Sequence, residues 1–406
     1  MASLRPAQKA LVVWWTAYLL SLPFTNVWVL PLVGQKLQLP ELVFLLGMPV
    51  WLWLPPRLLS HSLDKVLLLF PGAMVVSAII SPGVSAFLEV LGLVYLYGVY
   101  VLSRQAVCFV DSNLMKGILR LGLTLVIVIS LVSIVAGVMQ WEGSGYFAER
   151  KWLPFVGEVF RINGTSVSPN LWFSILAFYS ILNWKLNKGE QGFWLMTLFA
   201  VFSMLATFSK SILGFTGVLL MSFTQKCGWL RYLSLVTFAV YLFSVHFLIT
   251  PPKAQRASVS YLPEQACTAV YGGELCYTTY WLLKEKAVEA FVESKGLGVG
   301  GGQFTVYLNR QQALGEYPVE LTAKEPHSSY FGLLAETGIL GVIASGAVIL
   351  SIVRFRRRQL LEGIQQAALL YCFLLAVDAF VMDVLNFRML WVAFGHLIGH
   401  NNRELG

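Results

Sequence analysis

The chain has 406 residues, of which 57% are hydrophobic and 12% are charged, and its formal net charge is +8. Soluble globular domains carry about 25% charged residues, so this composition excludes an ordinary soluble protein and predicts a polytopic membrane protein. Membrane proteins concentrate Lys and Arg in cytoplasmic loops, and the positive charge therefore gives no reason to expect a nucleic-acid partner.

The first elements in chain order are apolar helices. The N-terminal segment has a basic start and an apolar run that continues to Leu32, without a small-x-small cleavage site, so we expect an uncleaved first span. Because a spanning helix needs roughly 20 mostly apolar residues, the sequence predicts twelve spans, and with them an all-α, polytopic membrane protein that forms a single integral membrane domain over residues 1–406. The spans lie at about 10–31, 40–56, 66–82, 85–103, 117–140, 167–184, 191–207, 211–225, 230–250, 329–353, 364–382 and 384–400.

Basic residues in the predicted loops give the orientation. They fall in every second loop and at both ends of the chain: Arg5 and Lys9; Arg57 and Lys65; Arg104, Lys116 and Arg120; Lys185 and Lys188; Lys226 and Arg231; RFRRR at 354–358; and Arg403. With twelve spans they all lie on one face, which the positive-inside rule makes cytoplasmic. Both termini are then cytoplasmic. The opposite, periplasmic face receives a short segment, 141–166, and a large loop between the ninth and tenth spans, 251–328.

Two of the five cysteines, Cys267 and Cys276, lie close together in the large loop. In an oxidising periplasm such a pair is expected to form a disulfide, with two free thiols as the alternative. The other cysteines, Cys108, Cys227 and Cys372, lie in or beside predicted spans, and the sequence has no CxxC or HExxH pattern. We therefore expect no bound catalytic metal.

Two cations on the periplasmic face are candidate ligands for an anion. Arg161 precedes the turn-rich run NGTSVSP that opens the sixth span, and the first turn of a helix offers unpaired backbone N–H groups. The alternative for Arg161 is an interfacial cation that snorkels to water. Lys210 lies in a very short turn between the seventh and eighth spans, against the positive-inside bias. Asn163 opens an Asn-Gly-Thr glycosylation sequon, although Asn-Gly is more simply a turn.

The second half of the large loop predicts an amphipathic helix. Its apolar face carries Tyr280, Leu283, Ala287, Val288 and Phe291. Lys284 lies off this face, and we expect the helix to rest on the membrane and to stop at Gly296. The glycines that follow spell G-x-G-x-x-G, but a dinucleotide fingerprint follows a strand and opens a helix, whereas here a helix precedes it. A structural turn and an approach to a phosphate-bearing lipid remain as interpretations.

Three more ionisable residues lie at periplasmic ends of spans. Asp383 and Arg388 flank the connection between the last two spans, where we expect them to form an ion pair or to take part in function. His327 lies where the large loop meets the tenth span. A lone interfacial histidine satisfied by headgroups or water is the simplest interpretation, but the convergence of the other candidates on this face favours a functional role.

The residues around His327 form the most specific motif. His327-Ser328 is followed by nine residues and then by Gly-x-x-Gly, with Ala-Glu-Thr directly before the first glycine. Together with RINGTSVSPN, TFSKSILG and the Trp281 segment that leads to GLGVGGGQF, this pattern resembles the O-antigen ligase and polymerase family of bacterial membrane glycosyltransferases. The matching segments lie within 161–214 and 278–345.

The chain departs from the family pattern at two places. Lys210 occupies the position of the family's arginine, and an ammonium lacks the planar fork of a guanidinium. The family also has an arginine shortly before the Trp281 position, where this chain reads CYTTYW. Arg256 and Lys284 are the residues that would have to supply this charge, although neither aligns with it.

The resemblance implies a glycan donor carried on undecaprenyl pyrophosphate and a metal-independent, inverting transfer at the periplasmic face of the bacterial inner membrane, without a cofactor. A pyrophosphate leaving group gains negative charge, and Arg161 and Lys210 are candidates to neutralise it. His327 is the candidate base for the acceptor hydroxyl, or it positions the acceptor. Lipid A–core as the acceptor makes the chain a ligase, and a second carrier-linked glycan makes it a polymerase.

Two alternatives remain. A protein O-oligosaccharyltransferase would use the same donor. A twelve-span transporter or flippase would place ionisable residues near the bilayer midplane. His246 and Glu89 are the residues in favour of a transporter, whereas the other candidates lie at periplasmic ends of spans.

Overall fold

A computed structural model gives the arrangement of these segments. It describes residues 4–399 with the exception of 28, 33–34, 57, 141–144, 146, 154–156, 188, 191, 223–227, 251–266, 271–272, 319–320, 322–323, 359–360 and 362. The described chain is mostly helical with a few short strands. The expected helical membrane fold is confirmed in this coarse form, but the fold is not purely α because short antiparallel hairpins join several of the helices.

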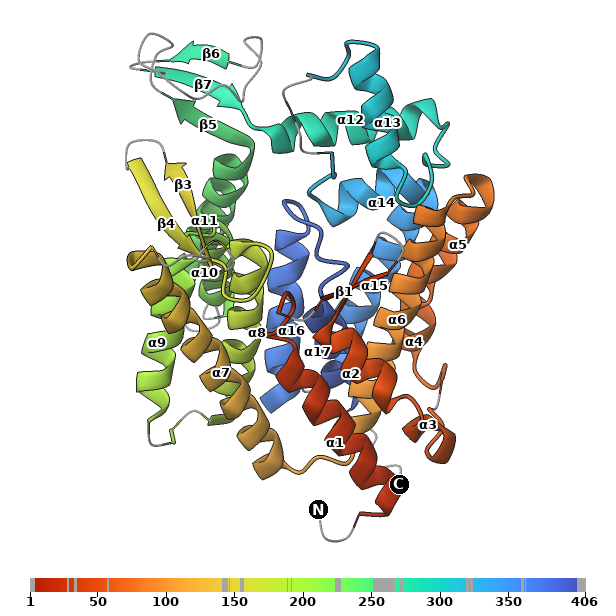
Figure 1. Ribbon diagram of the computed structural model, residues 1–406, viewed down its shortest axis with the longest axis vertical. Coiled ribbons are helices and arrows are strands. Elements are labelled where there is room, and N and C mark those ends of the chain that lie inside the picture. The colour runs from red at the N-terminus through yellow and green to blue at the C-terminus, as the bar shows by residue number, and fades with distance from the viewer. Residues whose placement is uncertain are drawn as a thin grey trace.

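The helices α1 to α17 supply most of the structure (Figure 1). They are α1 Pro6–Ser21, α2 Leu39–Gly47, α3 Val50–Trp53, α4 Ser62–Leu67, α5 Leu69–Ile80, α6 Val84–Val107, α7 Ser112–Val138, α8 Pro169–Asn187, α9 Phe193–Ala206, α10 Ser211–Ser222, α11 Trp229–His246, α12 Thr279–Glu293, α13 Phe304–Ala313, α14 Ser329–Thr337, α15 Ile339–Arg358, α16 Gly363–Asp378 and α17 Arg388–Gly399. The strands are β1 Val29–Leu32, β2 Gln35–Gln38, β3 Ala148–Leu153, β4 Gly157–Ile162, β5 Phe247–Thr250, β6 Cys267–Val270 and β7 Gly273–Tyr277.

Five helical stretches of the described chain are long and apolar enough to cross a bilayer: Ser62–Ile80 (α4 and α5), Val84–Val107 (α6), Ser112–Val138 (α7), Trp229–His246 (α11) and Ser329–Arg356 (α14 and α15). Each of the other predicted spans also contains a helix, but these helices do not meet both criteria. The chain is therefore a membrane-embedded protein, and the twelve-span topology stays a prediction.

The first predicted span is too long at its C-terminal end. Helix α1 ends at Ser21, and residues 29–32 form strand β1, which pairs antiparallel with β2. The sequence continues through Pro23, which has no backbone N–H to donate to the next helical turn. The apolar residues 29–32 beyond this proline therefore belong to a hairpin and not to the helix.

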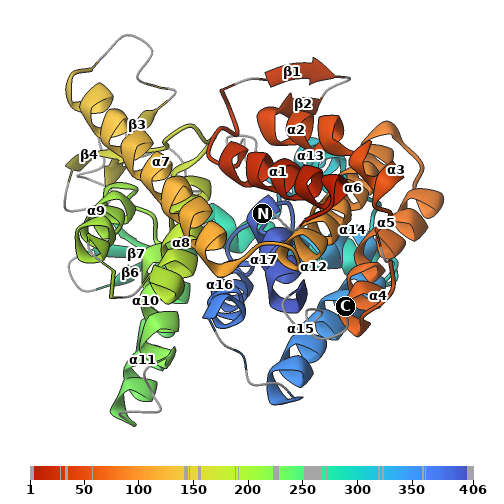
Figure 2. The ribbon, with the colours of Figure 1, turned by 90° about the horizontal axis from the view of Figure 1, so that it is seen from below.

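Helices α16 and α17 lie at the centre of the bundle, with α6 on one side and α8 on the other (Figure 2). Helix α17 is buried on all sides, including Trp391 and Phe394. It approaches α6 closely because Gly395 has no side chain, and a Cβ at this position would lie 2.5 Å from the Cβ of Ser103. The packing of the bundle thus depends on a small residue where two backbones meet.

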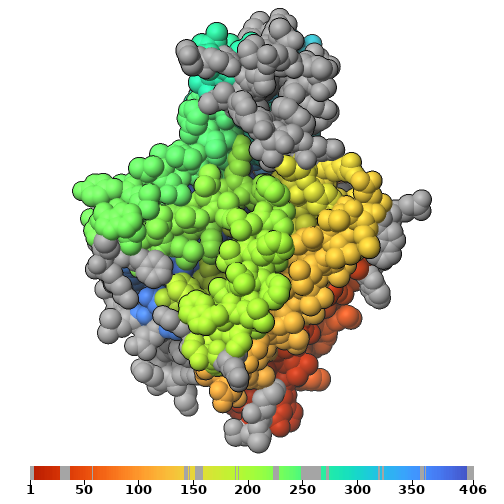
Figure 3. All heavy atoms as spheres, turned by 90° about the vertical axis from the view of Figure 1, so that its left-hand side faces the viewer, coloured from red at the N-terminus to blue at the C-terminus, as the bar shows by residue number. Residues whose placement is uncertain are grey.

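Helices α9, α10 and α11 form one outer face of the molecule (Figure 3). On this face large apolar side chains point outward, among them Trp194, Leu198, Phe202, Val236 and Phe243, which are 48–72% exposed. Soluble monomers rarely expose apolar surface on this scale. The composition of this face suits contact with lipid.

Helices α12, α13 and α14 lie toward the end of the bundle opposite the start of α1 (Figure 1). Leu283, Ala287 and Ala290 of α12 are buried against Phe304 and Leu308 of α13 and against α14. Leu283 and Ala287 of the predicted apolar face therefore pack against protein, whereas Val288 of the same face is 41% exposed, and contact of this helix with the membrane stays a prediction. The same packing buries Lys284, which the sequence places off this face.

The glycine-rich segment after α12 packs against the break between α14 and α15. Val299 N–H donates to the Ala335 carbonyl (2.8 Å), and Ile339 N–H donates to the Gly296 carbonyl (3.0 Å). Gly298 and Gly338 both have positive φ, and a Cβ on Gly298 would lie 2.5 Å from the Glu336 carbonyl oxygen. The two glycine motifs thus fit each other, which favours the structural interpretation of the G-x-G-x-x-G pattern.

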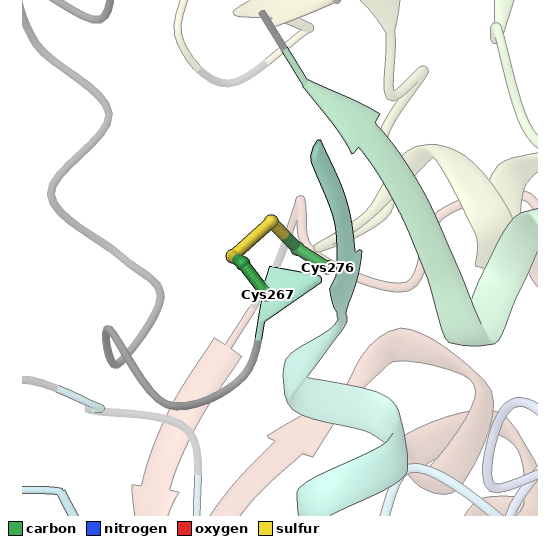
Figure 4. Close-up of a disulfide and its surroundings, with 2 residues drawn as sticks. All are labelled: Cys267 and Cys276. Carbon is green, nitrogen blue, oxygen red and sulfur yellow. A yellow bond between two sulfur atoms is a disulfide. The ribbon is translucent and has the colours of Figure 1, made fainter. Parts of the chain in front are cut away.

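Strands β5, β7 and β6 form a three-stranded antiparallel sheet in that order. Cys267 of β6 faces Cys276 of β7 in this register, and the two form a disulfide (Figure 4). The pairing expected from the sequence is therefore present. It ties together the hairpin that leads directly into α12.

Candidate functional site

A pocket of about 110 Å³ lies where the α9–α10 turn, α11 and α12 meet. It is lined by Arg161, Asn170, Phe208, Lys210, Ser211, Tyr241, Val245, Tyr280, Val381 and Met382. These residues come from β4, the start of α8, the α9–α10 turn, the start of α10, the end of α11, the start of α12 and the α16–α17 connection. The pocket thus joins the two cations that the sequence predicts for an anion site.

Arg161 is positioned by the β3–β4 hairpin. The register of this hairpin places Glu149 opposite Arg161, and Arg161 Nη1 donates to Glu149 Oε1 at 2.9 Å. Arg161 Nε donates to the Thr207 carbonyl at 3.1 Å, and the residue is only 7% exposed. Burial lowers the pKa of Arg161 while the Glu149 carboxylate opposes this, and a guanidinium stays protonated in either case. Arg161 is thus a fixed cation, and it is not an interfacial residue that snorkels to water.

The turn after Arg161 is packed into the protein. Asn163 is 5% exposed, and a Cβ on Gly164, whose φ is +57°, would lie 2.2 Å from the Trp172 ring. Helix α8 then starts at Pro169, as the sequence predicts, and Asn170 in its first turn faces the pocket. The burial of Asn163 favours the turn interpretation over the glycosylation sequon.

Lys210 lies in the turn between α9 and α10, as expected. Its ammonium donates to the Ser244 carbonyl near the end of α11. The preceding residue, Ser209, is buried and donates to Asn170 Oδ1 at 2.8 Å. The turn is therefore tied to both α8 and α11, and Lys210 itself remains exposed at the rim of the pocket.

His327 lies beside the pocket. Its ring packs against the ring of Tyr280, with 5.2 Å between the centroids, and Tyr280 lines the pocket. The backbone of His327 is left-handed (φ +45°), a conformation that non-glycine residues rarely adopt and that is often found at functional sites. Burial lowers the pKa of the imidazole, although the carboxylates of Glu325 and Asp383 oppose this. His327 is therefore neutral at physiological pH and able to accept a proton.

The two serines after His327 hold it in place. Ser328 caps α14 by accepting from the Phe331 N–H, and its hydroxyl donates to the Ala379 carbonyl at 2.7 Å. Ser329 donates to Asp383 Oδ1 at 2.8 Å. Both bonds tie the start of α14 to the α16–α17 connection. The motif thus fixes the position of His327 relative to Val381 and Met382 of the pocket wall.

The predicted Asp383–Arg388 ion pair is wrong. Arg388 Nε donates to Glu41 Oε1 at 2.6 Å and therefore joins α17 to α2. Asp383 instead accepts from Ser329 and from Asn386 Nδ2 at 2.7 Å. The helix turn at the start of α17 points Arg388 away from the connection, so proximity in sequence did not decide its partner. Asp383 thus contacts the start of α14 close to His327, whereas Arg388 contacts α2.

Lys284 and Arg256 are the two residues that could replace the arginine that the family has before the Trp281 position. The structure describes Lys284, whereas Arg256 lies outside the described residues. The Lys284 ammonium contacts Nε2 of His246 and lies 5.7 Å from the centroid of the Phe331 ring. Lys284 is one helical turn after Tyr280 on α12. It is thus close to the pocket but does not line it.

No protein-family model matches this chain, and no curated protein matches it either. Within the described part of the chain, the one group of side chains with metal-ligand proximity is Cys267, Glu274 and Cys276. The disulfide occupies both sulfur atoms of this group.

Several residues of the site are not evident from the sequence. Glu149 is one of them, although the alternation in AERKWL and GEVFRI is a signal for a hairpin that pairs it with Arg161. Tyr241 donates to the buried Asp378 at 2.7 Å at one side of the pocket. It lies in an apolar run, where nothing distinguishes it from a lipid-facing tyrosine. Asn170 belongs to the helix-start motif RINGTSVSPN, which does not distinguish it from its neighbours as a pocket residue.

Proposed function

We propose that this chain is a membrane glycosyltransferase that moves a glycan from undecaprenyl pyrophosphate to lipid A–core, as the resemblance to O-antigen ligases implies. The observation that supports this most is the convergence of Arg161 and Lys210 on one pocket whose Tyr280 wall packs against His327. These residues are far apart in sequence, and each has a part in the proposed reaction.

In this proposal the two cations, Arg161 and Lys210, stabilise the charge of the leaving group. The donor carries two negative phosphates, and the leaving diphosphate gains charge as the bond to the sugar breaks. Fixed cations stabilise such developing charge without reorganisation, as a metal would in other transferases. Arg161 is buried and held by two hydrogen bonds, so it is preorganised, whereas Lys210 at the rim can meet the headgroup as it enters.

In this proposal His327 removes the proton of the acceptor hydroxyl. The acceptor hydroxyl oxygen forms a bond to the anomeric carbon, the bond from that carbon to the phosphate oxygen breaks, and the hydroxyl proton passes to the imidazole. Attack opposite the leaving group inverts the anomeric configuration. A neutral imidazole is needed for this step, and burial of His327 favours that form.

The surroundings of the pocket suit lipid-linked substrates. The apolar face of α9–α11 lies beside it, so a polyprenyl chain in the bilayer can extend along that face while its diphosphate enters the pocket. We place the pocket on the periplasmic side of the bacterial inner membrane because of the basic residues in the alternate loops.

The proposal is tested by reconstituting the purified chain in liposomes with an undecaprenyl-pyrophosphate-linked glycan, lipid A–core and a chelator. We expect glycan on lipid A–core, seen as a shift on a gel. The variant His327→Ala should lose about two to four orders of magnitude in rate. The matched control is His61→Ala, since His61 caps α4 and lies outside the pocket. Lengthened carrier-linked glycan would identify a polymerase, and the absence of any covalent product would refute a transferase.

A further inference from the structure

An exposed group of aromatic rings lies where α11, the three-stranded sheet and α12 meet (Figure 1). The ring centroids of Phe247, Tyr277 and Trp281 lie 5.4–5.9 Å from one another, with interplanar angles of 24–49°. Phe243 of α11 stacks on Phe247 at 4.9 Å and supports it. Tyr277 and Trp281 are 39% and 42% exposed. The three rings, here called the aromatic cluster, thus offer apolar surface that the protein covers only in part.

The backbone holds the aromatic cluster in place. The register of the sheet places Phe247 of β5 opposite Tyr277 of β7, and Cys276 beside Tyr277 ties β7 to β6 through the disulfide. Thr278, the N-cap of α12, then joins this hairpin to the end of α11, because its hydroxyl donates to the Val245 carbonyl at 2.7 Å. The rings therefore have little freedom to lose when a ligand binds them.

The sheet that carries two of these rings belongs outside the hydrocarbon of the bilayer. Strands β5 and β6 are its edges, and an open edge presents backbone N–H and C=O groups that lipid tails cannot satisfy. The side chain of Thr268 on β6 is exposed, which also suits water. Phe247 and Tyr277 therefore face either lipid headgroups, which aromatic side chains often contact, or a ligand in the aqueous phase.

The aromatic cluster is continuous with the candidate pocket. Tyr280, which lines the pocket and packs against His327, lies between Tyr277 and Trp281 in the chain. This segment, CYTTYW, is also where the chain departs from the family pattern, because it carries aromatic residues and no arginine. A ligand that extends from the pocket toward the sheet thus meets aromatic rings, and the continuity favours a ligand over headgroups.

We propose that the aromatic cluster is a glycan subsite that binds pyranose rings. The C–H bonds on one face of a pyranose are apolar and slightly positive, and they fit the negative face of an aromatic ring. The sugar hydroxyls at the edge remain free to bond with water and with the Tyr277 hydroxyl. The inference rests on the proposed function and deepens it: the diphosphate lies in the pocket, and sugars beyond the first one lie on Tyr277 and Trp281.

The test measures KM in the liposome transfer reaction with two donors. One is undecaprenyl pyrophosphate that carries a single N-acetylhexosamine, and the other carries a glycan of several repeat units. In Trp281→Ala the ratio of KM for the long donor to KM for the short donor should rise about three- to tenfold. Trp281→Phe keeps a flat ring and should stay close to the wild-type ratio. If Trp281→Ala does not fold, Tyr277→Ala replaces it.

The matched control is Trp194→Ala, because Trp194 is also exposed but lies on α9, away from the aromatic cluster. Its KM ratio should equal that of the wild type. An unchanged ratio in a folded Trp281→Ala chain would overturn the inference and leave the proposed function standing. If that variant instead loses fluorescence quenching by lipids brominated near the headgroup, the cluster is a membrane anchor, which also overturns the inference.

A binding measurement keeps the two proposals separable. The probe is the free glycan of several repeat units, released from its carrier by mild acid, and its binding to the purified chain in detergent is followed by saturation-transfer NMR. We expect binding by the wild type and by Trp194→Ala, and weaker binding by Trp281→Ala. A wild type that binds this glycan but forms no covalent product would refute the transferase and retain the subsite. A wild type that transfers glycan but gives no saturation transfer would refute the subsite alone.

Discussion

Arg161→Ala separates the catalytic contribution of the anion site from its contribution to folding. The substitution removes the hydrogen bond to the Thr207 carbonyl and the ion pair with Glu149. The Glu149 side chain is 39% exposed and can be rehydrated. We therefore expect a loss of folding free energy of only about 1–3 kcal/mol. The transferase rate should fall about 10²–10³-fold, the usual cost of removing one preorganised group that stabilises the leaving charge.

The assay is the liposome transfer reaction, expressed per folded protein after a melting measurement in the same detergent. Arg120→Ala is the matched control, because Arg120 also pairs with a glutamate, Glu190, but lies outside the pocket. It should lose less stability than Arg161→Ala, because the Arg120 side chain is 43% exposed, and it should keep its transfer rate. If a folded Arg161→Ala chain transfers glycan as fast as the wild type, Arg161 does not hold the leaving group, and the assignment of the pocket fails.

Three further predictions concern topology, packing and pH. In a variant that lacks the native free cysteines, a cysteine that replaces Arg150 should react with a membrane-impermeant thiol reagent added to intact spheroplasts, and a cysteine that replaces Arg356 should not. The reverse labelling pattern would invert the predicted orientation. Gly395→Ala should destabilise the chain by about 1–3 kcal/mol in a melting assay because its Cβ meets α6, whereas Gly346→Ala, with nothing within 4 Å, should not; equal melting would contradict the packing. Because burial lowers the pKa of His327 below the usual 6.5, the neutral imidazole predominates at pH 6.5 and above, and the midpoint of the fall in transfer rate should lie below pH 6.5; a fall centred above 6.5 would contradict a buried base.

The sequence by itself determined the elements that local forces control. Apolar runs gave helices within each predicted span, Pro169 opens α8 where its start signal lies, and α14 begins at Ser329, the predicted start of the tenth span. The short turn that carries Lys210 and the pairing of Cys267 with Cys276 were also predictable. Each of these features depends on backbone preferences or on residues close in the chain, which a single sequence displays.

Only the tertiary structure decided which charges meet. Arg388 lies five residues from Asp383 in the sequence but pairs with Glu41 of α2, because the direction of a side chain follows from helix rotation and packing. Lys284 is on the polar side of its helix by periodicity, yet the packing of α12 against α14 buries it beside His246. The free energy of a charge depends on burial and on partners from distant segments, and these exist only once the helices have packed.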